Sequence, residues 1–254
     1  MNRTLVSLAA LASSVAVLAG CAGTPPHYAT ISAPVLFARA RSALLAANYK
    51  IAEGEFRALK ADHPFSHYAR EAALYLIYTH FMSGEDHEAA DAAHRFIREN
   101  PRSAEVPYAY FMIGVAESRS HLGFFDRLFA VNPDRRRVGH YRKAFDAFKT
   151  LLTRYPDSPY AQYARGEMVR IRNLIANHDL YVARFYLEKR AYVASANRAT
   201  TIIQKLPQTV AARTALGVLV EDYRHLDEPH LARTTETLLE LNRKAPSSTR
   251  HGSR

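Results

Sequence analysis

Five prolines divide most of the chain into units that share one pattern of apolar residues. A small residue lies twelve positions before each proline, and apolar residues follow that small residue at four and seven positions. This spacing places the three residues on one face of an α-helix, and proline ends a helix because it lacks the amide donor. The small residues are Ala52, Ala89, Ala144, Ser195 and Thr234, and the prolines are Pro64, Pro101, Pro156, Pro207 and Pro246. The pattern therefore predicts an amphipathic helix in each of five units.

A second amphipathic segment precedes each of these helices, so the unit is helix, turn, helix and proline. The segments span 35–47, 69–81, 106–119, 160–187 and 211–223. Successive prolines are 37, 55, 51 and 39 residues apart, so the unit looks like a tetratricopeptide repeat with insertions in the third and fourth units. We expect an all-α fold, a solenoid of about five tetratricopeptide-like helix pairs over residues 34–246, with N-terminal repeats in 34–156 and C-terminal repeats in 157–246.

The start of the sequence predicts export and a lipid anchor. After a positively charged start, the apolar run over 5–18 has 14 residues, too few for the roughly 20 that span a bilayer but typical of a signal-peptide core. The run leads into Leu18-Ala19-Gly20-Cys21, which resembles a bacterial lipobox and holds the only cysteine of the chain. The resemblance implies a lipid on Cys21 and, because Ala22 follows, sorting to the outer membrane. Residues 1–20 are thus expected to be a lipoprotein signal peptide, 21–33 a lipidated tether and 247–254 a disordered tail.

The motifs that most enzymes need are missing from the sequence. It has no glycine-rich phosphate loop, no His-Glu-x-x-His zinc motif and no Gly-x-Ser-x-Gly nucleophile elbow. A single cysteine excludes a cysteine-based zinc cluster and a disulfide framework. The formal net charge of +10 suits an anionic surface, but the basic residues are not interleaved with aromatic ones, and export removes nucleic acid as a partner. We therefore expect a protein that is not an enzyme, with no metal, no nucleic-acid partner and no cofactor besides the covalent lipid on Cys21.

Several short motifs lie in order along nearly the whole chain after the signal peptide, from about Phe37 to Leu241. They are HPFSHY at 63–68, LIY at 76–78, RFIRENP at 95–101, YPDSPY at 155–160, VARFY at 182–186 and the pair Asn197-Arg198. Together with the lipobox, they resemble the BamD (ComL) family, tetratricopeptide-repeat lipoproteins of the machinery that assembles outer-membrane β-barrels. The resemblance implies a lipid-anchored, non-enzymatic scaffold on the periplasmic face of the outer membrane.

The same resemblance implies the partners of the chain. The C-terminal repeats are implied to bind the periplasmic domains of the barrel-forming subunit BamA. The N-terminal repeats are implied to receive unfolded outer-membrane proteins. Other lipoproteins of the assembly complex are the third kind of partner. Asn197 and Arg198 fall on a matching pair of the family, which implies that Arg198 forms a salt bridge with an acidic residue of BamA. The residues alone also allow another interpretation, in which Arg198 is a solvated helix residue that contributes little binding or folding energy. One departure is Arg135-Arg136-Arg137, which stand in the third-unit loop where the family carries an acidic stretch, so contacts of that loop with accessory lipoproteins do not carry over.

The first helices of the first two units predict a substrate groove. When the proline that closes each unit is set at position 32 of the repeat, four residues fall on the surface that lines the inside of a tetratricopeptide solenoid. They are Phe37, Arg41, Tyr78 and Phe81. Aromatic rings beside a cation would suit a barrel strand that ends in an aromatic residue and a carboxylate. Ordinary helix packing explains Phe37 and Phe81 at least as well.

A second interpretation of the function is a periplasmic repeat lipoprotein that organises peptidoglycan enzymes. The two interpretations share the fold and the anchor and differ in what copurifies with the chain: BamA in the first case, murein synthases or hydrolases in the second.

Overall fold

The computed structural model describes residues 31–119 and 138–243, and within these ranges every regular element is an α-helix. The helices are α2 (Ala33–Leu45), α3 (Tyr49–Asp62), α4 (His67–Ser83), α5 (Asp86–Glu99), α6 (Val106–Arg119), α8 (Gly139–Arg154), α9 (Ala161–Glu188), α10 (Tyr192–Lys205), α11 (Val210–His225) and α12 (Pro229–Arg243). In these ranges, no helix combines the length and the apolar character that a membrane span requires. The signal peptide, Cys21 with most of the tether, the triple arginine at 135–137 and the predicted tail lie outside the described residues.

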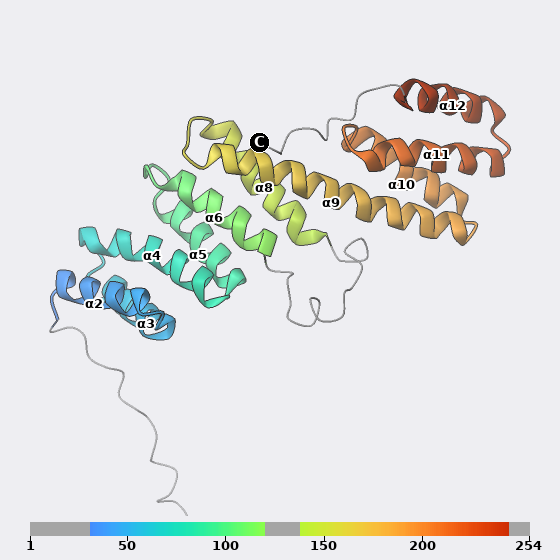
Figure 1. Cartoon of the computed structure of the whole chain (residues 1–254). Helices are drawn as coiled ribbons and strands as arrows, with labels where there is room; N and C mark the ends of the chain where they lie inside the picture. Colours follow the sequence, from blue (N-terminus) through green and yellow to red (C-terminus); the bar gives the residue numbers. More distant parts are fainter. Residues whose placement is uncertain (1–30, 120–137, 244–254) are drawn as a thin grey trace, which may run out of the picture.

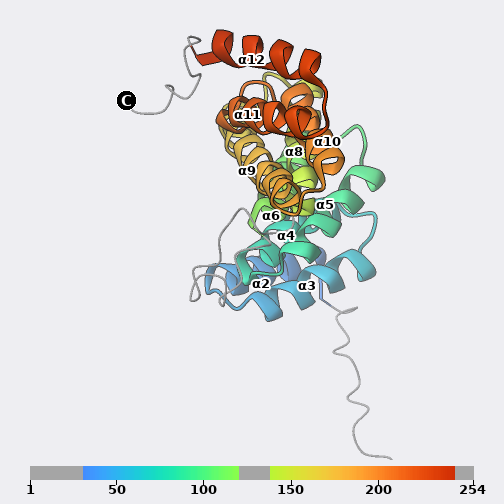
Figure 2. The same ribbon diagram turned by 90° about the vertical axis from the view of Figure 1, so that its right-hand side faces the viewer.

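The helices pair in chain order, and the pairs stack from α2 and α3 at one end to α12 at the other (Figures 1 and 2). The pairs are α2 with α3, α4 with α5, α6 with α8, α9 with α10 and α11 with α12. The first helices of successive pairs also contact one another, since α4 packs against both α2 and α6, and α9 against both α6 and α11. This arrangement confirms the predicted all-α solenoid. The long step in the fourth unit is an extended first helix, because α9 has 28 residues.

The predicted stripe forms the core of the first four pairs. In each second helix, the small residue and the apolar residues four and seven positions later are no more than 1% exposed. These residues are Ala52, Phe56 and Leu59; Ala89, Ala93 and Phe96; Ala144, Phe148 and Leu151; and Ser195, Ala199 and Ile202. The small residue lets the paired helices approach, and the larger residues fill the groove between them, as the pattern predicts.

The turns between paired helices have one common geometry in units one, two, four and five. Each contains a residue in the left-handed region, with φ of 58° at Ala47, Arg190 and Asp227 and 83° at Gly84. The amide of the next residue donates a 2.9 Å hydrogen bond to the carbonyl five residues before it, as in a Schellman motif. In the first, second and fourth units, the small residue of the stripe follows the left-handed residue by five positions. The turn therefore sets the register of the second helix.

The predicted register of the fifth unit is wrong by two residues. Thr234 is exposed, as are Leu238 and Leu241 at 46% and 65%, whereas Ala232 and Thr235 are buried. Ala232 lies five positions after Asp227, where the turn geometry requires the small residue. Counting back from Pro246 failed because this proline lies 14 positions after the buried Ala232, whereas the other four prolines lie 12 positions after their buried small residue.

The left-handed turns predict opposite effects for two reciprocal substitutions. Ala47→Gly should stabilise the chain by about 0.5–1 kcal/mol, because glycine adopts positive φ without the strain that a Cβ atom causes. Gly84→Ala should destabilise it by about 1 kcal/mol through the backbone alone, since a Cβ there would meet no atom within 4 Å. Urea unfolding followed by circular dichroism measures both changes. Gly54→Ala, in the middle of α3 and equally unobstructed, is the control and should stabilise the helix; destabilisation by Ala47→Gly would contradict the role of the turn.

Candidate functional site

Tyrosines from neighbouring units line two adjoining cavities, which we call the tyrosine groove. Tyr75 and Tyr78 on α4 line both cavities. The first cavity, of about 300 Å³, is completed mainly by residues of α2 and the following turn, among them Arg41. The second, of about 270 Å³, includes Tyr108 on α6 and Tyr160 just before α9. The tyrosine groove therefore extends from the first unit to the beginning of the fourth.

Arg41 supplies the positive charge of the tyrosine groove. Its guanidinium carbon lies 5.8 Å from the ring centre of Tyr75 and 6.0 Å from that of Phe37. Among the described residues, no carboxylate forms an ion pair with Arg41. A guanidinium held beside aromatic rings without an acidic partner is available to bind a carboxylate in a bidentate fashion.

The other end of the tyrosine groove carries the opposite charge. Glu105, which is exposed, lines the second cavity next to Tyr108. The Tyr108 hydroxyl can donate a hydrogen bond, as any tyrosine can at neutral pH, and burial raises its pKa further above the ordinary value. A cation at one end, a carboxylate at the other and aromatic faces between them suit an extended peptide.

Of the four residues predicted to line this groove, the structure brings together Arg41 and Tyr78. Phe37 requires correction, because it is 7% exposed and its ring packs against Phe56, Tyr68 and Tyr75. Phe37 thus packs behind the tyrosine groove, against the ring of Tyr75 that lines it.

Phe81 also requires correction. It is half-buried near the far end of α4, where the Arg119 guanidinium carbon lies 3.5 Å from its ring centre. Sequence reasoning missed Tyr75, Tyr108 and Tyr160 because it considered single positions in the first two units only. The density of tyrosine in the first helices of units two to four was the available signal.

Asn197 and Arg198 lie on the outer face of α10. Both are exposed, and within the described part of the chain neither side chain forms an ion pair or a hydrogen bond with another side chain. Ser195, two residues before Asn197, is fully buried in the interface. Packing therefore fixes the helix that carries Arg198 while the guanidinium stays in solvent.

A buried carboxylate lies behind this helix. Asp222 on α11 is fully buried, and neither of its carboxylate oxygens has a hydrogen-bond partner among the described residues. Burial raises the pKa of Asp222 to about 6, and the nearby Ser195 hydroxyl and the charge of His225 oppose this rise. The folded state of the chain is therefore more stable when the Asp222 carboxyl group is protonated than when it is ionised.

Glu53, His80 and Glu85 come from three different helices or their caps, and their ligand atoms lie within 4.8 Å of one another. The Nζ atom of Lys50 lies 3.2 Å from Glu53 and 3.1 Å from Glu85, while His80 Nδ1 lies 2.8 Å from Glu85. The hydrogen bonds from His80 and Lys50 lower the pKa of Glu85 to about 2. Because the protein's own cations neutralise both carboxylates, we interpret this group as a clamp that ties the first helix pair to the second.

Stacked helix pairs with an aromatic groove along the first helices define a tetratricopeptide-type repeat protein, a class whose members bind extended segments along their inner surface. The sequence pattern of the YfiO family, described as "Outer membrane lipoprotein", matches residues 30–238. The chain belongs to this family of outer membrane lipoproteins, which confirms the predicted location.

The chain is similar to three proteins named outer membrane protein assembly factor BamD. It is 31% identical to that of Xylella fastidiosa (strain 9a5c), over 92% of this chain and 81% of the relative. It is 31% identical to that of Vibrio cholerae, over 94% and 98%, and 32% identical to that of Neisseria gonorrhoeae, over 82% and 78%. The resemblance to the BamD family stated from short motifs is thus confirmed.

Asp222 predicts a measurable pH dependence. Its folded pKa of about 6 lies above the ordinary value of 3.8, so the folded state binds this proton more tightly and stability is lost as pH rises from about 4 to 6. The free energy of unfolding of the wild type should fall by an amount on the order of 2–3 kcal/mol over that pH range. Asp222→Asn should not show this fall and should have a higher urea midpoint than the wild type at pH 7. Glu188→Gln, at an exposed position on α9, is the control. A difference in stability between wild type and Asp222→Asn that is the same at pH 4 and pH 7 would show that Asp222 titrates normally.

Proposed function

We propose that this chain is a lipid-anchored scaffold of outer-membrane β-barrel assembly, which docks on BamA and receives unfolded barrel proteins in the tyrosine groove. Family membership over residues 30–238 carries the proposal, since the named relatives are outer membrane protein assembly factors. The anchor is the lipid on Cys21, and we assign the chain no catalytic step, metal or cofactor. The scaffold acts by holding its partners next to one another at the membrane.

The BamA contact is assigned to Asn197 and Arg198. Both side chains project into solvent from α10, and the interfaces of α10 with α9 and α11 hold the helix in place. Because Arg198 has no acidic partner among the described residues, a BamA carboxylate gains a charge-assisted hydrogen bond without breaking an existing one.

The substrate contact is assigned to the tyrosine groove. Arg41 accounts for recognition of a terminal carboxylate, and the rings of Tyr75 and Tyr78 account for an aromatic side chain next to it. The same two rings also line the second cavity, where Glu105 can accept hydrogen bonds from a backbone amide or a basic side chain and the Tyr108 hydroxyl can donate one to a backbone carbonyl.

Arg198→Glu should remove BamA from the complex while the anchored chain still folds. The test is an affinity pull-down from detergent-solubilised envelopes with mass spectrometry, and we expect BamA recovery to fall about tenfold or more. Lys205→Glu makes the same change of charge at an exposed site on α10 and should leave BamA recovery intact. Undiminished BamA with Arg198→Glu refutes this contact, and recovery of peptidoglycan enzymes without BamA from the wild type refutes the proposed function.

A peptide that ends in phenylalanine with a free carboxylate should bind the tyrosine groove, and its affinity should fall about tenfold when the terminus is amidated. Arg41→Glu should abolish this difference, because it removes the charge that distinguishes the two peptides. Fluorescence anisotropy with the full-length protein in detergent measures both effects. Arg70→Glu, exposed on α4 and outside both cavities, is the control; equal affinities of the two peptides for the wild type would contradict the role of Arg41.

A further inference from the structure

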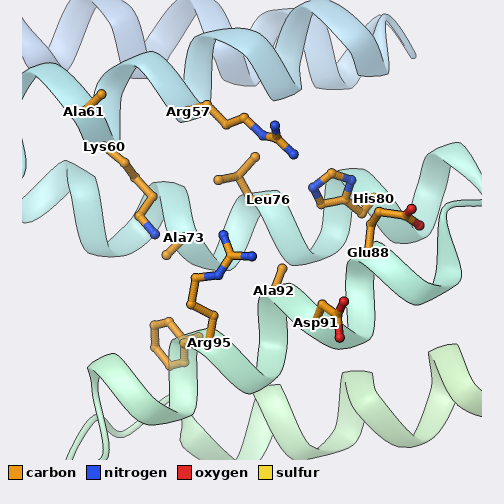
Figure 3. A pocket seen from close by; sticks show the side chains of 11 residues that line it. Arg57, Lys60, Ala61, Ala73, Leu76, His80, Glu88, Asp91, Ala92 and Arg95 are labelled. Carbon is orange, nitrogen blue, oxygen red and sulfur yellow. The ribbon is translucent and has the colours of Figure 1, made fainter.

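A second groove lies on the other side of α4, between α3 and α5 (Figure 3). It encloses about 520 Å³, and its apolar floor consists of Ala73, Leu76, Ala92 and Phe96. On α4, residues 73, 76 and 80 line this groove, whereas residues 75, 78 and 82 line the tyrosine groove. At 3.6 residues per turn these two sets lie on opposite faces of the helix, so the grooves are separate and can be occupied together.

Three cations border this second groove. Arg57 and Lys60 extend from α3, and Arg95 extends from α5 toward them (Figure 3). Carboxylates position the first two, since Arg57 pairs with Glu53 at 2.8 Å and Lys60 with Glu99 at 3.4 Å. Arg95 is exposed and forms no ion pair with the described residues. Its guanidinium therefore has the capacity to bind an anion over the apolar floor.

The groove also carries negative charge at its other end. Glu88 and Asp91 on α5 lie toward His80, as does the Arg57 side chain that pairs with Glu53, whereas Lys60 and Arg95 lie toward Ala73 (Figure 3). A densely anionic surface, such as phospholipid headgroups, would meet repulsion from Glu88 and Asp91. An extended peptide avoids this, because it can place a carboxylate at the cations, an apolar side chain on the floor and a basic side chain or amide groups at the acidic end.

We propose that this groove binds an extended acidic segment of a partner protein, with a carboxylate on Arg95 and Lys60 and a neighbouring apolar side chain over Leu76. The site goes beyond the proposed substrate and BamA contacts, since it involves neither the tyrosine groove nor α10. Its ligand is recognised by alternating acidic and apolar side chains, which an extended strand presents on opposite faces, and by one basic residue beyond them.

The test uses a fluorescein-labelled, C-terminally amidated peptide in which valine alternates with aspartate and a lysine follows. Its binding to the full-length protein in detergent is measured by fluorescence anisotropy. Arg95→Glu should raise the Kd at least tenfold, because it replaces attraction by repulsion at the carboxylate. Arg98→Glu, on the same helix but outside the groove, makes the identical change of charge and should alter the Kd less than twofold. Ala92→Leu fills the floor without changing the charge and should weaken binding as strongly as Arg95→Glu.

The other outcomes overturn the proposal. If both charge variants weaken binding equally, the peptide senses net charge and the groove is not its site. If a peptide with lysine in place of each aspartate binds as well, the cations do not select the ligand. If glycerol phosphate binds in an Arg95-dependent manner and the acidic peptide does not, the groove is a lipid-headgroup site instead. Circular dichroism of each variant shows that the helices are retained.

Discussion

The close approach of two helices at one small residue is the contact on which the rest of the solenoid depends. Ala52, Ala89, Ala144 and Ser195 are completely buried where the paired helices meet. The tolerance at such contacts is small, as Gly114 shows: a Cβ atom there would lie 2.4 Å from the ring of Phe148. A larger residue at any of these points would separate the helices, and through the contacts between first helices it would displace the neighbouring pair.

The close contact at the small residue also determines which side chains of each first helix face solvent. The Schellman turn places the small residue five positions after its left-handed residue, so the rotation of the second helix against the first is fixed. On α4, the face toward α3 and α5 carries Ala73, Leu76 and His80, and the opposite face carries Tyr75 and Tyr78. The tyrosine groove is thus a consequence of helix register, and its rings come together only because successive first helices contact one another.

Features that depend on residue spacing within one helix were predicted correctly from the sequence, whereas features that depend on the packing of two helices were not. The stripe of the first four second helices depends on spacing within one helix, and the prediction was correct. In the fifth unit, Pro246 lies two positions further from the buried small residue than the prolines of the other units do, and the register follows Asp227 instead. The repeat position of Phe37 allowed either a groove position or ordinary helix packing, and the rings of Phe56, Tyr68 and Tyr75 pack around it. The buried carboxylate of Asp222 could not be foreseen, because a polar residue in an amphipathic helix normally faces water.

The charges of the molecule separate into two sets with different consequences. Lys50 pairs with Glu53 and Glu85, and His80 contacts Glu85 across the first two helix pairs, so these contacts hold the pairs together and leave little for a ligand. Arg41, Arg95 and Arg198 have no acidic partner among the described residues, and each lies on a different surface. An exposed, unpaired guanidinium costs the free protein almost nothing, whereas an arriving carboxylate gains its full interaction with that group. Apolar packing and internal ion pairs therefore define the scaffold and leave these three guanidinium groups available for the partner contacts that we propose.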